Sequence, residues 1–312
     1  GGTRAKESCA AAPGARRDRP ARSTQRLKEL IARSHAGPAG FIGRGYSLPD
    51  LGRLVRHDLP QGGPAEIGGL RISGRAGGGN VVYLPPDGLG RPATIEMSAG
   101  LRDACFVFDA DLTMAPVINA HAAGQLAVFS GGIPSVGHGG KLSLTMFRRD
   151  QTFFWGKGST SNGVGVQLCG DERFIAVGDD CMFAHGIEMR THDMHALIDM
   201  GDGRQTNQPA SITIEPHVWI GPHVSLGKGV VVGFGSVIGA RSFVNRSIPR
   251  FCMAAGLPAR IVRRGTSWDR KSEAEPDTFL RLAETAASVA DRTPLPPELD
   301  PGHPSAQSVA LW

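Results

Sequence analysis

One of the ten histidines stands in a setting that suits proton transfer. His195 lies within the polar stretch Arg190-Thr-His-Asp-Met-His-Ala-Leu-Ile-Asp199. Because an imidazole titrates close to neutral pH, a histidine that a rigid fold positions and that solvent reaches can serve as a general base. Asp193 and Asp199 either orient this ring or are ordinary loop carboxylates. The spacing alone makes His195 a candidate catalytic residue.

Two further histidines allow a second kind of chemistry. His217 and His223 are six residues apart, and each precedes a valine. The surrounding sequence also repeats every six residues, so we expect the two side chains to point from the same face of the protein. They are either solvated surface histidines or a pair that binds a metal ion.

The chain from Ile214 to Pro249 indicates the scaffold that would position these side chains. Each of six consecutive hexads opens with an aliphatic residue, and Val, Ser or Ile stands fifth. A period of six fits neither an α-helix nor one long strand, but it fits short strands separated by tight corners. Three such hexads close one triangular coil, so the six hexads make two coils. We therefore predict a mainly β fold, a parallel β-helix whose aliphatic residues stack in a continuous core.

The same register begins before the regular repeat and is interrupted once. From Val177 to Ile214 the separation is 37 residues, which is one coil of 18 and an insertion of 19. The insertion, about residues 194–211, must leave the coil as a loop, and His195 stands at its start. Between Ile67 and Val177, β-rich runs alternate with turn residues at looser spacing. They form either irregular coils of the same β-helix or a separate β domain.

Helical patterns flank the β-rich region. Leucine and isoleucine recur at helical spacing from Ser23 to about His35, a second short pattern follows from Pro49 to Val55, and a third runs from Pro276 to about Arg292. The expected parts of the chain are a disordered basic tail (1–22), a helical N-terminal adaptor (23–66), the β-helix domain with its loop insertion 194–211 (67–264), and a C-terminal helix and tail (265–312).

Charge and cysteine content limit the partners. The net charge is +5, but no long Lys/Arg block lies inside the folded part, so we expect no nucleic acid partner. The five cysteines are odd in number and show no CxxC spacing, which favours free thiols in a reducing compartment. No apolar run reaches the ~18 residues that a membrane span needs. The expected location is the cytoplasm.

Several motifs together resemble a known family. They are His217-Val-Trp-Ile-Gly221, Ser236-Val-Ile-Gly-Ala240, Ile248-Pro249, Ala254-Ala-Gly-Leu-Pro-Ala-Arg260, and the Asp193-Met-His195 entry to the loop. This combination resembles the hexapeptide-repeat acyltransferases with a left-handed β-helix, in the branch that O-acetylates sugars and surface polysaccharides. The resemblance implies a homotrimer whose active sites lie between neighbouring prisms.

The resemblance also implies a mechanism. His195, with Asp193 beside it, would be catalytic and would take the proton from an acceptor hydroxyl as that oxygen attacks the thioester of acetyl-CoA. The transfer would be direct, without a serine or cysteine nucleophile. Acetyl-CoA enters as a co-substrate, and no metal is expected.

Further positions correspond to the acyl-CoA contacts of the family. Trp219 would lie beside the acyl chain and the pantetheine, although it could instead pack between subunits. Arg260 and Arg263 would meet the CoA phosphates, although a solvated charge run is the alternative. The expected pantetheine wall consists of Ala240, Asn245, Ala255, Gly256, Pro258 and Ala259. Pro222, Arg241 and Asn245 depart from the residues that relatives often carry there.

These observations predict an acetyl-CoA-dependent O-acetyltransferase that modifies a hydroxyl of a sugar or polysaccharide. N-acetylation of an amino-sugar or a xenobiotic is the nearest alternative, because the sequence does not separate a hydroxyl from an amine acceptor. A second alternative is a metal site like that of the γ-class carbonic anhydrases, built from His185, His217 and His223. A third is a β-helix that serves as a non-catalytic assembly platform.

Overall fold

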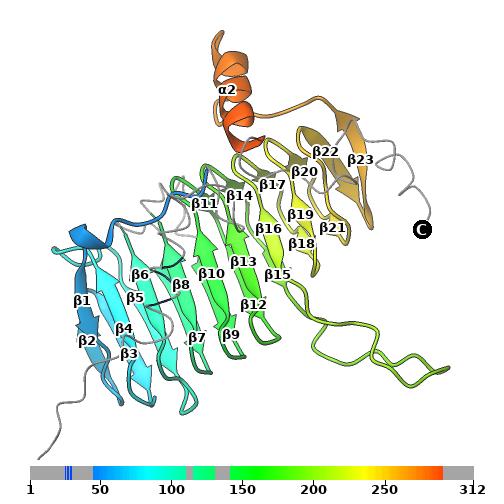
Figure 1. Ribbon diagram of the computed structural model, residues 1–312. Coiled ribbons are helices and arrows are strands. Elements are labelled where there is room, and N and C mark those ends of the chain that lie inside the picture. The colour runs from blue at the N-terminus through cyan, green and yellow to red at the C-terminus, as the bar shows by residue number, and fades with distance from the viewer. Residues whose placement is uncertain are drawn as a thin grey trace, which may run out of the picture.

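The computed structural model describes residues 45–109, 115–130 and 141–290, together with Gln25, Leu27 and Glu29. In these residues the chain winds into an elongated coil with three sheets along its length (Figure 1). The sheets contain eight, six and nine strands, and we call them sheets I, II and III. The prediction of a mainly β, coiled architecture is confirmed.

The strands of each sheet follow one another along the coil. Sheet I consists of β1 (Val55–Asp58), β4 (Val81–Leu84), β6 (Cys105–Phe108), β8 (Leu126–Phe129), β10 (Thr152–Trp155), β13 (Phe174–Val177), β16 (Ile212–Ile214) and β19 (Val231–Val232). Sheet II consists of β11 (Thr160–Ser161), β14 (Met182–Phe183), β17 (Trp219–Ile220), β20 (Val237–Ile238), β22 (Cys252–Gly256) and β23 (Ala259–Arg264). Sheet III consists of β2 (Ala65–Ile67), β3 (Leu70–Gly74), β5 (Ala93–Met97), β7 (Ala115–Ala120), β9 (Lys141–Met146), β12 (Val164–Leu168), β15 (Ile187–Arg190), β18 (Ser225–Leu226) and β21 (Phe243–Val244).

The register of the regular coils matches the repeat of the sequence. Trp219 pairs in parallel with Val237, three hexads later, and Ser225 pairs with Phe243 at the same separation. Val177 pairs with Ile214, on the far side of the insertion, so the coil resumes in register after it. The hexad prediction is therefore confirmed.

The looser β-rich region continues the same coil. Thr152 pairs in parallel with Phe174, a longer step than the three hexads of a regular coil. In sheet I, β4, β6, β8 and β10 are consecutive parallel neighbours. These runs thus form irregular coils, and the alternative of a separate β domain is wrong. The additional residues lengthen strands and corners without breaking the pairing of the sheets.

Two positions of each hexad fill the core. The residues that open the six hexads are buried: Ile214, Ile220, Leu226, Val232, Ile238 and Val244. The residues at the fifth position are buried as well: Val218, Val224, Val230, Ser236, Ser242 and Ile248. Burying one aliphatic side chain stabilises the fold by about 1.5–3 kcal/mol, so stacking coil on coil stabilises each side of the prism.

The strands β4, β6, β8 and β10 of sheet I are buried on both faces. The outer face of this sheet carries the apolar side chains of Val81, Val107 and Phe154, which form a second cluster with Leu27 and Tyr46 from the N-terminal part. The hydroxyl of Tyr46 donates a hydrogen bond to the carbonyl oxygen of Ile214 at 2.9 Å. The N-terminal residues therefore cover this face and exclude water from it.

The N-terminal helices are only partly as expected. Gln25, Leu27 and Glu29 have helical conformation, but most of the expected helix from Ser23 to His35, like the tail 1–22, lies outside the described residues. The expectation of a second helix at Pro49–Val55 is wrong. Leu51–Arg53 forms a single 3-10 turn, Leu54 is extended, and β1 follows. Gly52 disfavours a longer helix, and pairing of β1 with β4 favours extended backbone.

The C-terminal part crosses back over the coil. Residues 265–270 follow β23, and the Arg270 guanidinium hydrogen-bonds the carbonyl oxygens of Gly158 and Cys181 at 3.0 Å. The helix α2 (Thr278–Ala290) then stands away from the prism (Figure 1). The prediction of a C-terminal helix is confirmed, while residues beyond Ala290 lie outside the described part. None of the described helices is long and apolar enough to cross a membrane.

The buried ion pair between Glu215 and Arg250 connects the last coils. Removing one partner tests how much this pair stabilises the fold. The carboxylate of Glu215 is almost fully buried and accepts two hydrogen bonds of 2.6 Å from the Arg250 guanidinium and one of 2.7 Å from the amide of Phe234. We expect Arg250→Ala to lower the free energy of unfolding by roughly 3–5 kcal/mol, because it leaves a buried carboxylate without its partner.

Chemical denaturation followed by circular dichroism measures this loss. Arg149→Ala is the matched control, since Arg149 pairs with Asp171 on the surface and such pairs contribute at most about 1 kcal/mol. Equal stability of the two variants would contradict a structural role for the buried pair.

Candidate active site

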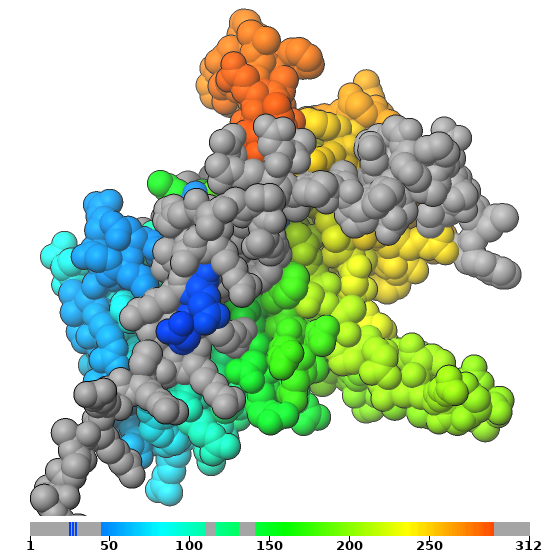
Figure 2. Space-filling view, in the orientation of Figure 1, coloured from blue at the N-terminus to red at the C-terminus, as the bar shows by residue number. Residues whose placement is uncertain are grey.

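The insertion forms an arm that projects from the prism. It leaves the coil after β15 of sheet III and rejoins it at β16 of sheet I. We call residues 191–211 the arm. The edge of the prism between sheets III and I, from which the arm projects, is called the arm corner. Both views show the arm extending well beyond the coil (Figures 1 and 2). Most arm side chains from Asp193 to Thr206 are exposed. The arm is thus an accessible element launched from a rigid scaffold.

A buried asparagine fixes the start of the arm. The side-chain amide of Asn207 donates hydrogen bonds to the carbonyl oxygen of His195 at 2.7 Å and to the carboxylate of Asp193 at 2.8 Å. Its side-chain oxygen accepts a hydrogen bond from the amide of Leu197 at 2.8 Å. One side chain on the returning strand of the arm therefore holds three residues of the outgoing strand.

A lysine from the next coil holds the same carboxylate. Lys228 follows β18 on the arm corner, and its ammonium group forms a salt bridge with Asp193. The hydrogen bond from Lys228 lowers the pKa of Asp193, so this carboxylate is charged at neutral pH. Asp193 therefore anchors the arm to the prism in this structure, and its bonds go to Lys228 and Asn207 rather than to an imidazole.

The imidazole of His195 is exposed just beyond this anchor. Among the described residues it forms no hydrogen bond, while its backbone carbonyl is held by Asn207. The backbone of His195 is thus fixed and its ring is open to a substrate. This arrangement fits the geometric requirement for a general base, which must reach the proton that it accepts.

The tryptophan of the predicted site lies on sheet II. Trp219 is 37% exposed, and its ring lies 6.1 Å from the ring of Trp268. Trp268 itself is buried and stacks on His217 at 4.4 Å with an angle of 11°. The C-terminal crossing therefore supports one side of Trp219 and leaves the other side to solvent.

Small residues form a surface next to this tryptophan. The hairpin of β22 and β23 pairs Ala255 with Arg260 and Gly256 with Ala259. A Cβ atom at Gly239 would lie only 2.9 Å from the Cβ of Ala255, so the neighbouring coils are in close contact here. The hairpin and the corner after β20 carry the remaining predicted positions of this group, Ala240, Pro258 and Arg263.

The chain thus separates the predicted site residues into two groups. Asp193, His195 and Asn245 lie on the arm corner, where Asn245 follows β21 and neighbours Gly227. The other group belongs to sheet II and its hairpin or adjoins them. The coil places the two groups on different edges of the prism. One chain alone does not bring His195 to Trp219.

The corner histidines are not equivalent. His217 is buried, with Nδ1 at 2.7 Å from the Asp180 carboxylate and Nε2 at 3.0 Å from the carbonyl oxygen of Trp268. His223 is exposed and meets His185 edge to face at 4.9 Å between ring centres. The expectation that His217 and His223 share a face is wrong, because residues six apart occupy successive corners of a three-sided coil.

These contacts argue against a metal site built from His185, His217 and His223 within one chain. Both ring nitrogens of His217 are engaged by acceptors, so this ring offers no free ligand atom. Within the part of the chain that the structure describes, no group of three or more His, Cys, Asp or Glu side chains could hold a metal ion. The His185, His217 and His223 set therefore does not assemble within this chain.

The cysteines that the structure describes are poorly suited to act as a nucleophile. The four described cysteines, Cys105, Cys169, Cys181 and Cys252, are free and buried. Burial raises the pKa of the Cys181 thiol to about 12, which leaves almost no thiolate at neutral pH. The cytoplasmic location that free thiols favour stays a prediction.

Sequence reasoning missed the residues that support the candidate site. Lys228 stands in a Gly-Lys-Gly hexad and looks like an ordinary solvated corner. Trp268 lies 51 residues from His217 and carries no motif. Of the supporting residues, only Asn207 could have been found from the sequence. It lies near the end of a short insertion that starts near His195, and the two ends of such an insertion must be close together.

Comparison with known proteins identifies relatives of the chain. No protein-family model matches it. It is 40% identical over 116 residues to a polysialic acid O-acetyltransferase of Escherichia coli O1:K1 / APEC, which covers 37% of this chain and 38% of that protein. It is 37% identical over 62 residues to a polysialic acid O-acetyltransferase of Neisseria meningitidis, covering 20% of this chain and 29% of that protein. The chain thus spans less than two fifths of the length of these curated relatives.

Structural similarity reaches further along the chain. The crystal structure of the polySia specific acetyltransferase NeuO superposes with a TM-score of 0.57 and 25% sequence identity. The match covers 70% of this chain and 98% of that one. The coil, its repeat and these comparisons together confirm the predicted resemblance: the chain is similar in sequence and in fold to hexapeptide-repeat β-helix acetyltransferases, and polysialic acid O-acetyltransferases are among the proteins that it resembles.

Proposed function

We propose that this protein transfers an acetyl group from acetyl-CoA to a hydroxyl group of a sialic acid polymer. The observation that carries the proposal is His195, which stands open to solvent at the base of an arm that Asn207 and Lys228 anchor. The acceptor comes from the relatives, which are polysialic acid O-acetyltransferases. An amine acceptor is less favoured, because both of these relatives are O-acetyltransferases.

The reaction needs one base and no covalent intermediate. His195 accepts the proton of the acceptor hydroxyl while that oxygen attacks the thioester carbon. The bond between this carbon and sulfur then breaks, CoA leaves as a thiol or thiolate, and the acetyl ester remains on the sugar. The imidazolium of His195 can return its proton to the departing sulfur.

The surface of sheet II and its hairpin fits the pantetheine of acetyl-CoA. Gly239, Ala240 and Ala255 have no side chain or only a methyl group and are at least partly exposed, so a narrow chain can approach the backbone closely here. Trp219 exposes a flat apolar face beside them, and Arg260 and Arg263 add exposed guanidinium groups at the hairpin. Guanidinium groups suit the phosphates of CoA.

We further propose a homotrimer with a left-handed coil. Within one chain His195 and Trp219 belong to different edges of the prism, so a complete site requires the arm corner of one copy to face sheet II of a neighbour. Cyclic symmetry repeats this contact and gives one site at each interface.

Replacing the proposed base tests the chemistry. We expect His195→Ala to lower kcat by roughly 10²-fold or more, because proton transfer by a positioned side chain contributes about this much. Release of the CoA thiol with polysialic acid as acceptor measures the rate. His57→Ala is the control, since His57 lies in β1 at the N-terminal end of the coil. Unchanged turnover in His195→Ala would remove this residue from the mechanism.

Mixing two inactive variants tests whether the site is shared between chains. His195→Ala and Trp219→Ala should each lose activity, while mixed oligomers that are unfolded and refolded together should regain about one quarter of the wild-type turnover, since a site receives both intact residues with probability ½ × ½. Each variant refolded alone is the control. Absence of recovery in mixed oligomers of verified composition would place the whole site within one chain.

A further inference from the structure

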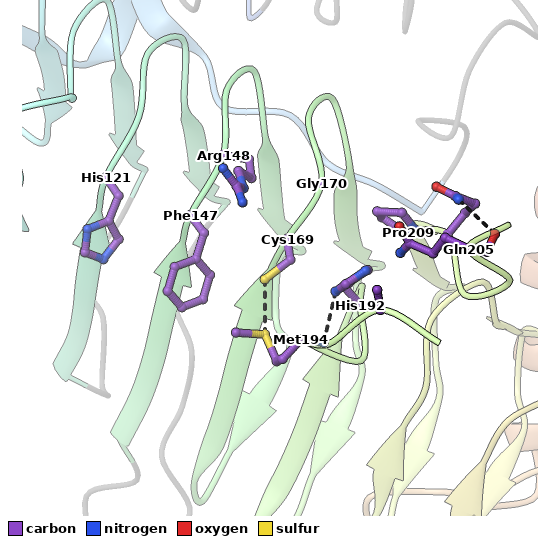
Figure 3. Close-up of a pocket in the computed structure, with 11 residues that line it drawn as sticks. His121, Phe147, Arg148, Cys169, Gly170, His192, Met194, Gln205 and Pro209 are labelled. Carbon is purple, nitrogen blue, oxygen red and sulfur yellow. Dashed lines mark hydrogen bonds between the residues drawn. The ribbon is translucent and has the colours of Figure 1, made fainter. Parts of the chain in front are cut away.

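A cavity lies at the base of the arm, on the side toward the N-terminal coils. It has a volume of about 670 Å³ and opens to solvent between the arm and the corners of sheet III (Figure 3). Successive coils contribute His121, Phe147 and Cys169, and the arm contributes His192 and Ala196. Ala196 directly follows His195, so the cavity adjoins the proposed base. Its volume is in the range of sites for small organic ligands.

The lining of the cavity suits an anion. It includes one arginine, Arg148, two histidines and the side-chain amides of Gln205 and Gln208, but no carboxylate. Arg148 is exposed and forms no salt bridge with any residue that the structure describes. The next residue, Arg149, is instead paired with Asp171 at 2.8 Å and does not line the cavity. The charge of Arg148 contributes to lowering the pKa of Asp171, but Asp171 forms its salt bridge with Arg149. The Arg148 guanidinium can therefore bind a ligand carboxylate through two parallel hydrogen bonds.

Two flat rings form one wall of the cavity. His121 and Phe147 occupy the same position on consecutive coils, and their rings stack with 5.5 Å between centres and an angle of 4°. The hydroxyl of Ser98, from the preceding coil, lies 2.6 Å from Nδ1 of His121 and holds that ring in place. A flat, half-buried aromatic surface beside polar groups suits the C–H face of a sugar ring.

We propose that this cavity is a subsite for a carboxylate-bearing sugar residue of the acceptor polymer. This sugar residue is the neighbour of the one whose hydroxyl group His195 deprotonates. Arg148 binds the carboxylate, the His121–Phe147 wall supports the ring, and the glutamine amides bind hydroxyl groups. The polymer then runs from the arm back along the corner of the N-terminal coils. This inference rests on the proposed function, because it concerns the acceptor of the same reaction.

Substitution of Arg148 tests the subsite. We expect Arg148→Ala to raise KM for polysialic acid roughly 10-fold, which corresponds to the loss of one charge-assisted interaction, and to leave KM for acetyl-CoA unchanged. Arg149→Ala is the matched control, with the same change of charge one residue away and outside the cavity, and its KM should equal that of the wild type. An unchanged KM in Arg148→Ala, or an equal rise in both variants, would overturn the proposal.

Changing the polymer tests which group Arg148 binds. Polysialic acid whose carboxylates have been converted to amides should have a KM roughly 10-fold higher with the wild type, because the guanidinium loses its anion. With Arg148→Ala the native and amidated polymers should have similar KM values, because this variant already lacks the interaction between the guanidinium and the carboxylate. Equal sensitivity of both enzymes to amidation would show that the carboxylate is bound elsewhere and would overturn the proposal.

A binding measurement separates the subsite from the reaction. If the wild type transfers no acetyl group to polysialic acid, the proposed function fails, and the subsite is then judged by fluorescence anisotropy of labelled polysialic acid with His195→Ala. Binding that weakens roughly 10-fold when Arg148→Ala is added, and not when Arg149→Ala is added, supports the subsite. Absence of binding, or equal binding by all three proteins, would overturn it.

Discussion

The backbone pairing between successive coils is the constraint on which the structure depends. Gly221 donates to the carbonyl oxygen of Ile238, and Gly227 donates to that of Val244, each at 2.8 Å. Each coil therefore satisfies the polar groups of its neighbour, and an unpaired buried group would cost about 1–3 kcal/mol. A segment of any length can be inserted at a corner only if the chain returns to the same register. The pairing of Val177 with Ile214 meets this condition across the arm.

The three faces of the prism are consequently free to differ. The outer face of sheet I is covered by apolar residues of the N-terminal part, including Leu27 and Tyr46. Sheet II carries Trp219 and the hairpin of small residues, and the arm corner carries His195. Antiparallel strands stand at the ends of the coil: β1 and β2 pair with β4 and β3 at one end, and β23 pairs with β22 at the other.

The regular part of the fold could be predicted because its cause is local. The aliphatic residues of the hexads recur at fixed spacing, and burial of those side chains decides the register. The site could be predicted only in part. Lys228 and Trp268 act through contacts with residues 35 and 51 positions away, which no local pattern encodes. The relation of His217 to His223 was mistaken because positions that share a corner are three hexads apart, as Trp219 and Val237 are on their strands.

The way in which the arm joins the coil has an evolutionary consequence. The arm begins and ends at the same corner of the coil. The hydrogen bonds between Asn207 and Asp193, His195 and Leu197 all join residues of the arm to one another. Lengthening, shortening or exchanging the outer part of the arm would leave the pairing between neighbouring coils unchanged. Descendants of such a chain could therefore diversify what they modify while inheriting an unaltered framework.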